Sequence, residues 1–405
     1  METVETNKSS IKKVLFIDTG LSFGGSLVVA ARIANEINAF GYQSVVVTPV
    51  EKSLIQHHFN DDVVIVNEKK PITYKDKMEL ADKLAKIKLS PLRKLISLTY
   101  NLIEVIKNRK YTANIRKTII EHNIDIVHNN NCYDSIKVCK KMGVKVIWHF
   151  HGYLNDSSRT TRKWLSQCDH FIAISQCVYD SAAESDFIPK EKLTKLFNPI
   201  QSQITQYTKA DLNNQKAKLG VSEDKFVIGV FGRLVGWKGQ LEFLDAYQDF
   251  CAQFPNSIAM FVGDDSEYGG YKQQLVEKID ALKLNDNIVF AGYVTETDLH
   301  YQLCDLVVHC SIKPEPFGLV ITEAMQNQRP IIASTHGAGK ELVEHGKNGF
   351  IADPLNPKEL SKYMLDAANN QALREAFIVN ANHFVSSLNA RDYAKAISAI
   401  YNNVL

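Results

Sequence analysis

Two glutamates, Glu315 and Glu323, have the chemistry needed to recognise a ligand that is rich in hydroxyl groups. The segment that contains them, 313–323, reads Lys-Pro-Glu-Pro-Phe-Gly-Leu-Val-Ile-Thr-Glu. A carboxylate accepts hydrogen bonds from hydroxyls, and sugars and riboses carry many of these. An ordinary loop and amphipathic helix with solvated glutamates would show the same spacing. The rest of the chain decides between these two interpretations.

The prolines beside Glu315 predict that it lies in a loop, because Pro314 and Pro316 both disfavour helix. Residues 305–309 before it predict a strand, and the residues from Phe317 onwards are compatible with a helix. The first backbone N–H groups of a helix attract anions such as phosphate, and Gly318 allows a close approach. These elements predict a nucleotide-sugar site, with phosphate at the helix start, Glu323 on the ribose and Glu315 on the sugar.

Length and composition predict a folded protein with two or three domains. The chain has 405 residues, of which 45% are hydrophobic and 23% charged, and this is too long for one hydrophobic core. The net charge of +2 gives no general case for nucleic-acid binding. The seven cysteines are scattered without CxxC spacing, so neither a zinc site nor a disulfide framework is expected.

No segment has the composition of a signal peptide or of a membrane-spanning helix. Residues 1–13 are polar, and no run of about 18 apolar residues occurs. We expect a cytoplasmic protein, with peripheral contact to the inner face of the cell membrane as one option.

The first half of the chain alternates apolar runs with helical periodicity, which is typical of a doubly wound parallel sheet. Residues 13–18 predict a strand, followed by a glycine-rich turn and a helix. Gly24 and Gly25 in this turn would let the backbone approach a ligand, although a tight turn explains them equally well. The turn lacks the GxGxxG spacing of dinucleotide binders, which argues against a Rossmann dehydrogenase.

A strand at 144–149 ends in His149-Phe150-His151-Gly152. Residues just past the end of a parallel strand line the ligand crevice, and alternation sends both histidines to one side. No Asp, Glu or Cys accompanies them at ligand spacing, so a metal site is not expected. One of them has a hydrogen-bonding role in the functional interpretation, and the alternative is a structural histidine.

Residues 68–117 are strongly basic, with 14 Lys or Arg against 5 Asp or Glu. Basic and apolar residues are mixed in it, as in a pair of helices that lie on an anionic membrane surface. A basic face for an anionic or lipid-linked acceptor is a second interpretation. Amphipathic helices whose basic faces are only solvated are the third.

The second half restarts the alternating pattern after a polar linker at 202–219. Strand 226–231 precedes a loop, 232–239, that carries Arg233 and Lys238. Two cations beside glycine-rich backbone suit a diphosphate. Further strands are predicted at 258–262, 288–291, 306–310 and 331–334, and closing helices at 363–377 and 393–404. Two such domains imply a cleft that closes on a substrate.

The second half resembles a retaining glycosyltransferase of the GT-B fold, glycosyltransferase family 4. The resemblance covers most of residues 226–354. The first half of the chain matches the family more loosely. Its motifs are Gly232-Arg-Leu-Val-Gly-Trp-Lys-Gly239, Phe261-Val-Gly-Asp264, Gly292-Tyr-Val294, Glu315 to Met325, Arg329-Pro-Ile-Ile-Ala333 and Asn348-Gly-Phe-Ile-Ala352, with Gly24-Gly25, His151-Gly152, Ile174-Ser175 and Asn198-Pro199 before them. Two positions depart from the family: Gln328 replaces a usual glycine, and Gln201 replaces a common aspartate on the acceptor side.

The resemblance implies a role for each matching residue. Glu315 would bind donor sugar hydroxyls, Glu323 the ribose, and His151 the donor sugar near the reacting carbon. The implied catalytic residues are His151, Arg233, Lys238 and Glu315. The implied donor-binding residues are Gly24, Gly25, Gly232, Arg233, Lys238, Glu315, Phe317, Gly318, Leu319 and Glu323.

The resemblance implies an α/β protein with two doubly wound, Rossmann-like domains facing each other across a cleft. Residues 1–200 would bind the acceptor, 201–385 the nucleotide sugar, and 386–405 would form a helix that packs back on the first domain. The implied activity moves a sugar, with retention and without a metal or other cofactor, from a nucleotide-diphosphate sugar to a saccharide or polyprenyl-linked saccharide. Bacterial surface polysaccharide synthesis is the implied pathway. A nucleotide-sugar epimerase and a non-catalytic binding subunit are the alternatives.

Overall fold

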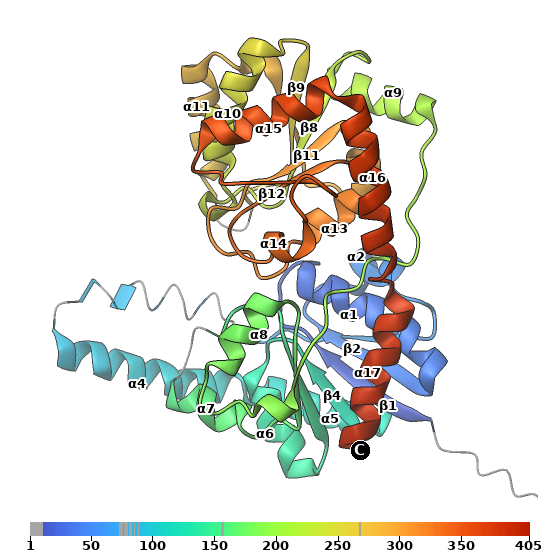
Figure 1. The fold of residues 1–405 in the computed structure, drawn as a ribbon. Coiled ribbons are helices and arrows are strands. Elements are labelled where there is room, and N and C mark those ends of the chain that lie inside the picture. Colours follow the sequence, from blue (N-terminus) through green and yellow to red (C-terminus); the bar gives the residue numbers. More distant parts are fainter. Residues whose placement is uncertain are drawn as a thin grey trace, which may run out of the picture. The chain divides into compact units, whose positions relative to one another are not determined.

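The computed structural model describes residues 11–72, 76, 80, 83, 84, 86, 87, 89–154, 158–266 and 269–405, except the side chains of residues 101 and 105. The chain forms two compact units (Figure 1). Unit 1 comprises Met1–Ile174, Val178–Leu196 and Ala390–Leu405, and unit 2 comprises Ser175–Cys177 and Phe197–Asn389. The chain therefore leaves unit 1 close to the expected boundary at 200, and its last helix belongs to unit 1.

The described part of unit 1 is built on a seven-stranded parallel sheet in the order β3-β2-β1-β4-β5-β6-β7. The strands are β1 (Lys12–Ile17), β2 (Tyr42–Thr48), β3 (Val64–Asn67), β4 (Ile126–Asn129), β5 (Lys145–Phe150), β6 (His170–Ala173) and β7 (Leu193–Lys195). The helices of the first half and the last helix are α1 (Gly25–Glu36), α2 (Lys52–Ile55), α4 (Ser90–Lys107), α5 (Arg109–His122), α6 (Tyr133–Met142), α7 (Arg159–Leu165), α8 (Gln176–Ala183) and α17 (Ala390–Val404).

The core of unit 1 explains why α17 belongs to it. Apolar residues recur along one face of α17, and Tyr393, Ile397 and Tyr401 are buried with residues of α1, β1 and β2. This is the pattern of a helix that covers a sheet. The last helix therefore completes a core whose other members all come from the first half of the chain.

Unit 2 is built, in its described part, on a six-stranded parallel sheet in the order β10-β9-β8-β11-β12-β13. Its strands are β8 (Phe226–Phe231), β9 (Ser257–Val262), β10 (Ile288–Gly292), β11 (Leu306–His309), β12 (Ile331–Ser334) and β13 (Phe350–Ala352). Its helices are α9 (Lys209–Lys218), α10 (Gln240–Gln253), α11 (Tyr271–Leu282), α12 (Thr297–Leu303), α13 (Leu319–Gln326), α14 (Gly339–Leu342), α15 (Pro357–Asn369) and α16 (Gln371–Ser386).

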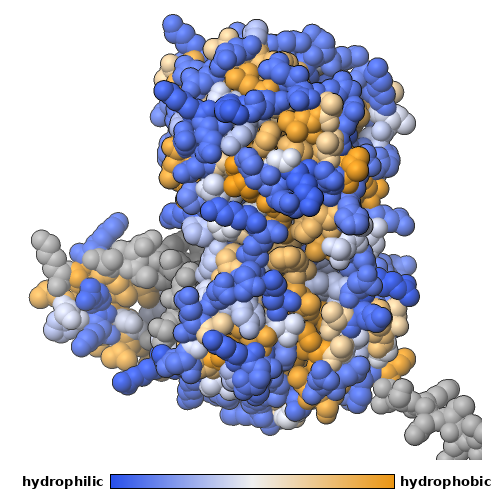
Figure 2. All heavy atoms as spheres, viewed as in Figure 1, coloured by the Kyte–Doolittle hydropathy of each residue, from blue (hydrophilic) through white to orange (hydrophobic). Residues whose placement is uncertain are grey.

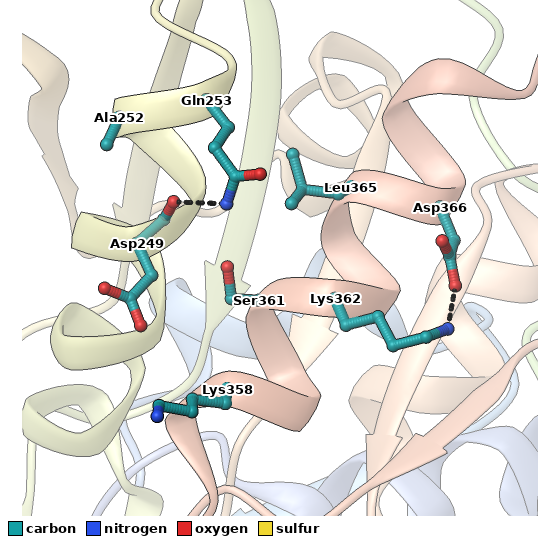
Figure 3. A pocket seen from close by; sticks show the side chains of 8 residues that line it. All are labelled: Asp249, Ala252, Gln253, Lys358, Ser361, Lys362, Leu365 and Asp366. Carbon is teal, nitrogen blue, oxygen red and sulfur yellow. Dashed lines mark hydrogen bonds and ion pairs between the residues drawn. The ribbon is translucent and has the colours of Figure 1, made fainter.

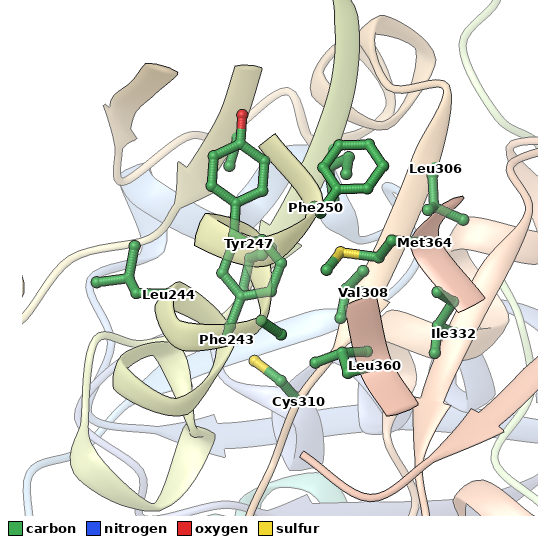
Figure 4. Packing of buried hydrophobic residues seen from close by; sticks show 14 of the residues in the cluster. Phe243, Leu244, Tyr247, Phe250, Leu306, Val308, Cys310, Ile332, Leu360 and Met364 are labelled. Carbon is green, nitrogen blue, oxygen red and sulfur yellow. The ribbon is translucent and has the colours of Figure 1, made fainter. Parts of the chain in front are cut away.

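The core of unit 2 forms where α10 and α15 pack on the sheet (Figure 4). Phe243, Tyr247 and Phe250 recur at helical spacing on α10, and each is fully buried. They lie against strand residues such as Val308 and Ile332, whose β-branched side chains suit a sheet that is covered on both faces.

The prediction of one helix at 363–377 was wrong, because the structure divides this segment between α15 and α16. Asn370 separates them in an extended conformation, with φ −128° and ψ 91°, and its side chain accepts a hydrogen bond from the Leu373 N–H. Asparagine is among the preferred residues at this capping position. The new helix therefore begins within the apolar pattern that predicted a continuous one.

Gln328, where the family usually has glycine, adopts a left-handed backbone conformation with φ 57°. Glycine takes this conformation without strain, which explains why the family usually has glycine at this position. Its N–H donates to the carbonyl of Met325 at 3.0 Å, so the turn that ends α13 is formed despite the substitution.

Candidate active site

Each sheet has a point at which the strand order reverses, and the predicted site residues lie at these points. In unit 1 the reversal falls between β1 and β4, and in unit 2 between β8 and β11. Ligands of open α/β sheets bind outside the carboxyl ends of the strands at such a point. Each unit therefore has one edge at which its predicted residues are expected to act.

The loop that follows β8 is held by backbone contacts with its neighbours. Gly232, with φ 128°, donates its N–H to the Val262 carbonyl at 2.9 Å. The N–H of Ile312 donates to the carbonyl of Trp237, also at 2.9 Å. At the end of the loop, a Cβ on Gly239 would lie 1.9 Å from the Cys310 carbonyl oxygen. The loop after β8 is thus in direct contact with the loop after β11.

This contact brings Lys238 and Glu315 together. The Lys238 Nζ lies 2.6 Å from Glu315 Oε2, and the two side chains are 13% and 12% exposed. Ser311 Oγ donates to the same oxygen at 3.0 Å, and His309 Nε2 lies 3.5 Å from it. The Nζ also lies 4.3 Å from the centre of the Trp237 ring, a favourable position for a cation.

These neighbours keep Glu315 ionised. Burial by itself raises the pKa of Glu315, but the charge of Lys238 and hydrogen bonds from His309 and Lys238 outweigh it. The net result is a pKa well below the usual value of a glutamate. Glu315 is therefore an acceptor of hydrogen bonds across the physiological pH range, as binding of sugar hydroxyls requires.

The backbone of Glu315 is fixed by the loop that follows β12. Its N–H donates to the His336 carbonyl at 3.3 Å, and its carbonyl accepts from Ala338 N–H at 2.9 Å. Gly337 lies between these two residues, where a Cβ would come within 2.3 Å of the Glu315 backbone. Residues from three loops thus position this one carboxylate.

Glu323 lies inside α13, one turn after the helix start. The helix begins after Gly318, which has φ 86° and caps it without a side-chain hydrogen bond. Tyr301, a fully buried residue, donates its hydroxyl to Glu323 Oε2 at 3.1 Å and stacks on Phe231 with ring centres 3.9 Å apart. The second carboxylate is therefore also held in place by its own hydrogen bond.

The remaining predicted residues of unit 2 lie in the same two loops. Arg233 directly follows Gly232, and its carbonyl accepts from Gln240 Nε2 at 2.9 Å. Phe317 is buried, and Leu319 is the first residue of α13. The structure thus brings the predicted residues of unit 2 to one edge of its sheet.

In unit 1 the predicted glycines lie at the start of α1. Gly24 is its N-cap, with an extended backbone and no side-chain cap, and Gly25 is its first residue. Asn130 Nδ2 donates to the carbonyl of Ser26 at 3.2 Å and to Asp18 Oδ2 at 3.2 Å. The start of α1 is therefore joined to the ends of β1 and β4 by a buried asparagine and a buried aspartate that the sequence analysis did not select.

The strand-end histidines belong to a buried hydrogen-bonded chain. Tyr401 hydroxyl lies 2.7 Å from His128 Nδ1, and His128 Nε2 lies 3.0 Å from His149 Nδ1. His149 Nε2 then lies 3.3 Å from the hydroxyl of Tyr393. Burial lowers the pKa of His128 to about 3, and the pKa of His149 also falls well below its usual value. His149 is thus a structural member of this chain.

His151 lies beside this chain without belonging to it. Its ring centre is 4.2 Å from that of His149, and its buried Nε2 has no hydrogen-bond partner among the described residues. Burial lowers the pKa of His151 to about 4, although the charge of Asp18 acts in the opposite direction. The structure therefore distinguishes the two histidines, which the alternation of the strand alone placed on the same side.

Some supporting residues were missed by the sequence analysis. Ser311 and His309 contact Glu315 from the end of β11, and Tyr301 contacts Glu323 from α12. Ser311 could have been selected from the sequence, because it lies two residues beyond the strand predicted at 305–309, where ligand-facing residues are expected. Gln201 was interpreted as a lost carboxylate, and in the structure its amide donates to Asp298 at 2.9 and 3.1 Å, a contact that a carboxylate could not make.

A separate hollow of about 510 Å³ lies between α10 and α15 (Figure 3). It is lined by Asp249, Ala252, Gln253, Lys358, Ser361, Lys362, Leu365 and Asp366. Lys362 is paired with Asp366 at 2.5 Å, and none of the predicted site residues lines it. Within the described residues, no group of three or more His, Cys, Asp and Glu is placed to hold a metal ion.

Two protein families match the chain, one in each half. The family described as Glycosyltransferase Family 4 matches residues 23–203, and the family described as Glycosyl transferases group 1 matches residues 211–384. Together the two matches cover most of the chain. They meet between α8 and α9, where the chain passes from unit 1 to unit 2.

Known relatives of similar length agree with these families. Alpha-monoglucosyldiacylglycerol synthase of Acholeplasma laidlawii is 24% identical over 367 residues, which cover 83% of this chain and 88% of that protein. The putative glycosyltransferase YtcC of Bacillus subtilis is 25% identical over 318 residues, covering 73% of this chain and 76% of that protein.

A solved structure of similar fold is that of HepE of Anabaena in complex with UDP and glucose. It has a TM-score of 0.76 and 24% sequence identity, and the match covers 96% of this chain and 99% of that one. WaaG, a glycosyltransferase involved in lipopolysaccharide biosynthesis, matches with a TM-score of 0.65 over 96% of this chain and 99% of that one, at 17% identity. With two Rossmann-like units and both family matches, the chain belongs to the group 1 glycosyltransferases of family 4 and has the GT-B fold.

Proposed function

We propose that the protein transfers a sugar, with retention of its anomeric configuration, from a nucleotide-diphosphate sugar to a hydroxyl of a saccharide or lipid-linked saccharide. The observation that carries this proposal is the Lys238–Glu315 pair at the reversal point of the second sheet, beside the start of α13. It puts a cation for phosphate and an ionised acceptor for sugar hydroxyls at the same edge. Family membership supports transferase activity in general.

The mechanism that we propose needs no nucleophile from the protein. The acceptor hydroxyl attacks the donor sugar from the face that the nucleotide leaves, and the departing diphosphate takes the proton of that hydroxyl. Negative charge grows on the diphosphate as the bond breaks, so Arg233, Lys238 and the first N–H groups of α13 stabilise the transition state. Lys238 can act without releasing Glu315, because an ammonium group has three donors.

The proposed catalytic residues are His151 of unit 1 and Arg233, Lys238 and Glu315 of unit 2. In this proposal, His151 contacts the donor sugar, and Gly24 and Gly25 approach the diphosphate. We propose that catalysis requires no metal ion. In this mechanism the cationic side chains supply the charge that a metal would otherwise provide.

The relatives suggest the classes of donor and acceptor. HepE was solved with UDP and glucose and with UDP-glucose, and other relatives are a monoglucosyldiacylglycerol synthase and a lipopolysaccharide core mannosyltransferase. We propose that this chain acts in the synthesis of a bacterial surface saccharide, on the cytoplasmic face of the membrane.

The first test is a thermal-shift panel of UDP-, GDP-, ADP- and dTDP-linked sugars, with and without EDTA. A ligand that binds only the folded state raises the melting temperature by mass action. We expect one nucleotide class to stabilise the protein, equally with and without EDTA. Nucleotide should then be released only when a saccharide acceptor is added, which separates a transferase from an epimerase. No shift with any donor would contradict the proposal.

Replacing Glu323 by alanine should weaken binding of the nucleotide by about tenfold or more. Hydrogen bonds to a charged group contribute about 1.5–3 kcal/mol, and the ribose hydroxyls would lose theirs. Calorimetric titration with the free nucleotide measures the effect. Glu375, an exposed glutamate of α16, supplies the control, and Glu375→Ala should bind the nucleotide as the wild type does. Equal affinity of the two variants would remove the ribose assignment.

Contact with the membrane is proposed through α4. Its leucines and isoleucines recur along one half of the helix and are exposed, among them Leu92, Leu95, Leu98, Leu102, Ile103 and Ile106. No described side chain of α4 is buried, and Figure 2 shows hydrophobic as well as hydrophilic side chains at the surface of this segment. Such a helix loses apolar exposure when it lies in a lipid surface.

The charges of α4 favour an anionic lipid surface over another apolar partner. Arg93, Lys94 and Lys107 lie on the remaining half of the helix, and Glu104 is its one described acidic residue. The next helix differs, because α5 buries Tyr111, Ile115 and Ile119. We therefore propose membrane contact for α4 alone, and not for a pair of helices, in the part of the segment that the structure describes. No helix in the described part of the chain can span a bilayer.

Replacing Leu95 and Leu98 together by glutamate should abolish binding to vesicles that contain phosphatidylglycerol. The change removes apolar area and places negative charge against anionic lipid. Co-sedimentation at low and high salt measures it, and the wild type should be released by salt. Leu355→Glu, at an exposed leucine of unit 2, is the matched control and should still bind. Equal sedimentation of all three proteins would contradict a role for α4.

A further inference from the structure

The amide of Asn130 lies at the reversal point of the first sheet, and one of its two polar atoms lacks a partner. The residue is only 5% exposed. Its Nδ2 donates to Asp18 Oδ2 and to the Ser26 carbonyl, each at 3.2 Å. Its Oδ1 is buried and has no hydrogen-bond partner in the part of the chain that the structure describes. Buried carbonyl oxygens are normally paired, so this oxygen is available to accept a hydrogen bond from a group outside the chain.

The orientation of this amide follows from the chemistry of its neighbours. A carboxylate and a backbone carbonyl only accept hydrogen bonds, so the nitrogen of the amide must face Asp18 and Ser26. Asp18 is itself fixed, because its Oδ1 accepts from Gly20 N–H at 2.8 Å and from Asn131 Nδ2 at 3.3 Å. The oxygen of Asn130 therefore has to point away from this cluster.

A second unpartnered atom comes from the neighbouring strand. Asn130 directly follows β4 and His151 directly follows β5, and these strands are paired with Asn129 opposite Trp148. His151 Nε2 is buried without a partner among the described residues. Asp18 is near enough to His151 for its charge to act on that ring. The carboxyl ends of adjacent strands thus bring two unsatisfied polar atoms to one edge.

The charges at this edge decide what kind of ligand fits. The Asp18 carboxylate holds Asn130 directly, and the atom left free is an acceptor, to which an ionised phosphate has no hydrogen to donate. A hydroxyl is neutral, and it can donate to an amide oxygen. We propose that Asn130 Oδ1 and His151 Nε2 form a subsite for a sugar hydroxyl, in which the hydroxyl donates to Asn130 Oδ1 and Asp18 is a positioning residue. The subsite rests on the proposed function, because a sugar must reach this edge.

The test compares two adjacent asparagines that both donate to Asp18. Asn130→Ala removes the unpartnered oxygen. Asn131→Ala removes a similar donor to Asp18, but the oxygen of Asn131 is already used by Thr19. A third variant, Asn130→Ser, keeps a hydroxyl near Asp18 and is too short to present the oxygen. Thermal melting establishes that each variant is folded.

Each protein is titrated with UDP-glucose, UDP-N-acetylglucosamine, GDP-mannose and ADP-glucose and with the corresponding free nucleotides. Transfer kinetics follow with the sugar nucleotide that binds the wild type most tightly. We expect both Asn130 variants to bind free nucleotide normally and to lose about tenfold in kcat/KM. Asn131→Ala should stay within about twofold of the wild type.

The pattern of the loss identifies the sugar that supplies the hydroxyl. Weaker binding of the nucleotide sugar, with unchanged binding of the nucleotide, assigns the hydroxyl to the donor. Unchanged donor binding with a higher KM for the acceptor assigns it to the acceptor. Asn130 variants with wild-type donor affinity and wild-type kinetics would overturn the subsite. If the wild type binds none of the nucleotides, the proposed function fails first and the subsite fails with it.

Discussion

Replacing Glu315 by alanine should lower the rate of sugar transfer by about a hundredfold or more and also destabilise the protein. The rate falls because the sugar hydroxyls lose their ionised acceptor and Lys238 loses the group that positions it. The stability falls because Lys238, 13% exposed, keeps a charge without its partner. Removing one partner of a buried ion pair costs about 3–5 kcal/mol. Single-turnover kinetics and urea unfolding measure the two effects separately.

The control for this prediction is the double variant Glu315→Ala, Lys238→Met. Methionine removes the unpaired charge and keeps most of the volume, so the double variant should be more stable than Glu315→Ala alone. Its transfer activity should nevertheless remain low, because both groups that we propose to bind the donor are gone. A double variant no more stable than Glu315→Ala alone would show that the unpaired charge of Lys238 is not what destabilises that variant, contrary to the 2.6 Å separation of the two charged atoms.

The same pair predicts how stability depends on pH. The pKa of Glu315 is lowered in the folded protein, so the unfolded chain binds a proton at this site more readily than the folded one. Its contribution is therefore fully present above the pKa of an unfolded glutamate, about 4.3, and is lost as the pH falls below that value. In Glu315→Gln, the loss of stability on acidification should be smaller than in the wild type.

Replacing Gly239 by alanine should destabilise unit 2 by about 3 kcal/mol or more, and the variant should lose activity. Gly239 has φ 73°, and a Cβ there would lie 1.9 Å from the carbonyl oxygen of Cys310. Both loops would have to move apart, which would separate Lys238 from Glu315. Strain of the left-handed conformation adds about 1 kcal/mol. Urea unfolding and nucleotide titration measure the outcome.

Gly41 supplies a matched control, because it has φ 86° but no atom within 4 Å of the added Cβ. Gly41→Ala carries the conformational strain without the collision, so it should lose only about 1 kcal/mol and keep its activity. If both alanine variants lose the same stability, the close approach of the two loops is not what requires glycine at position 239.

The sequence predicted the two sheets because each strand is a short apolar run followed by a turn and a helix. It also selected Lys238 and Glu315 separately, through the motifs that surround them. Their pairing could not be predicted in this way, since the two residues are 77 positions apart and meet only when β8 and β11 become neighbours. The pairing needs the strand order of the folded sheet, which local pattern does not contain.

The remaining differences have similar causes. His149 and His151 are both histidines and were predicted to lie on the same side of the strand. His149, however, is hydrogen-bonded to Tyr393, a residue 244 positions away. Asn130 is one of three consecutive asparagines in the sequence. Only the contacts of the folded chain show that its side-chain oxygen lacks a hydrogen-bond partner among the described residues. In the basic segment, α4 is the more apolar of the two helices, yet it is α5 that buries side chains in the fold. Each of these distinctions depends on distant contacts.

The position of α17 has a consequence for the synthesis of the chain. β1 and α1 are translated before unit 2, but Tyr393, Ile397 and Tyr401 of the same core are translated only after it. Domains generally fold in the order of their synthesis. Here unit 2 can be complete while the unit translated before it still exposes the surface that α17 covers. The nascent chain should therefore depend on chaperones until residues 390–404 have emerged.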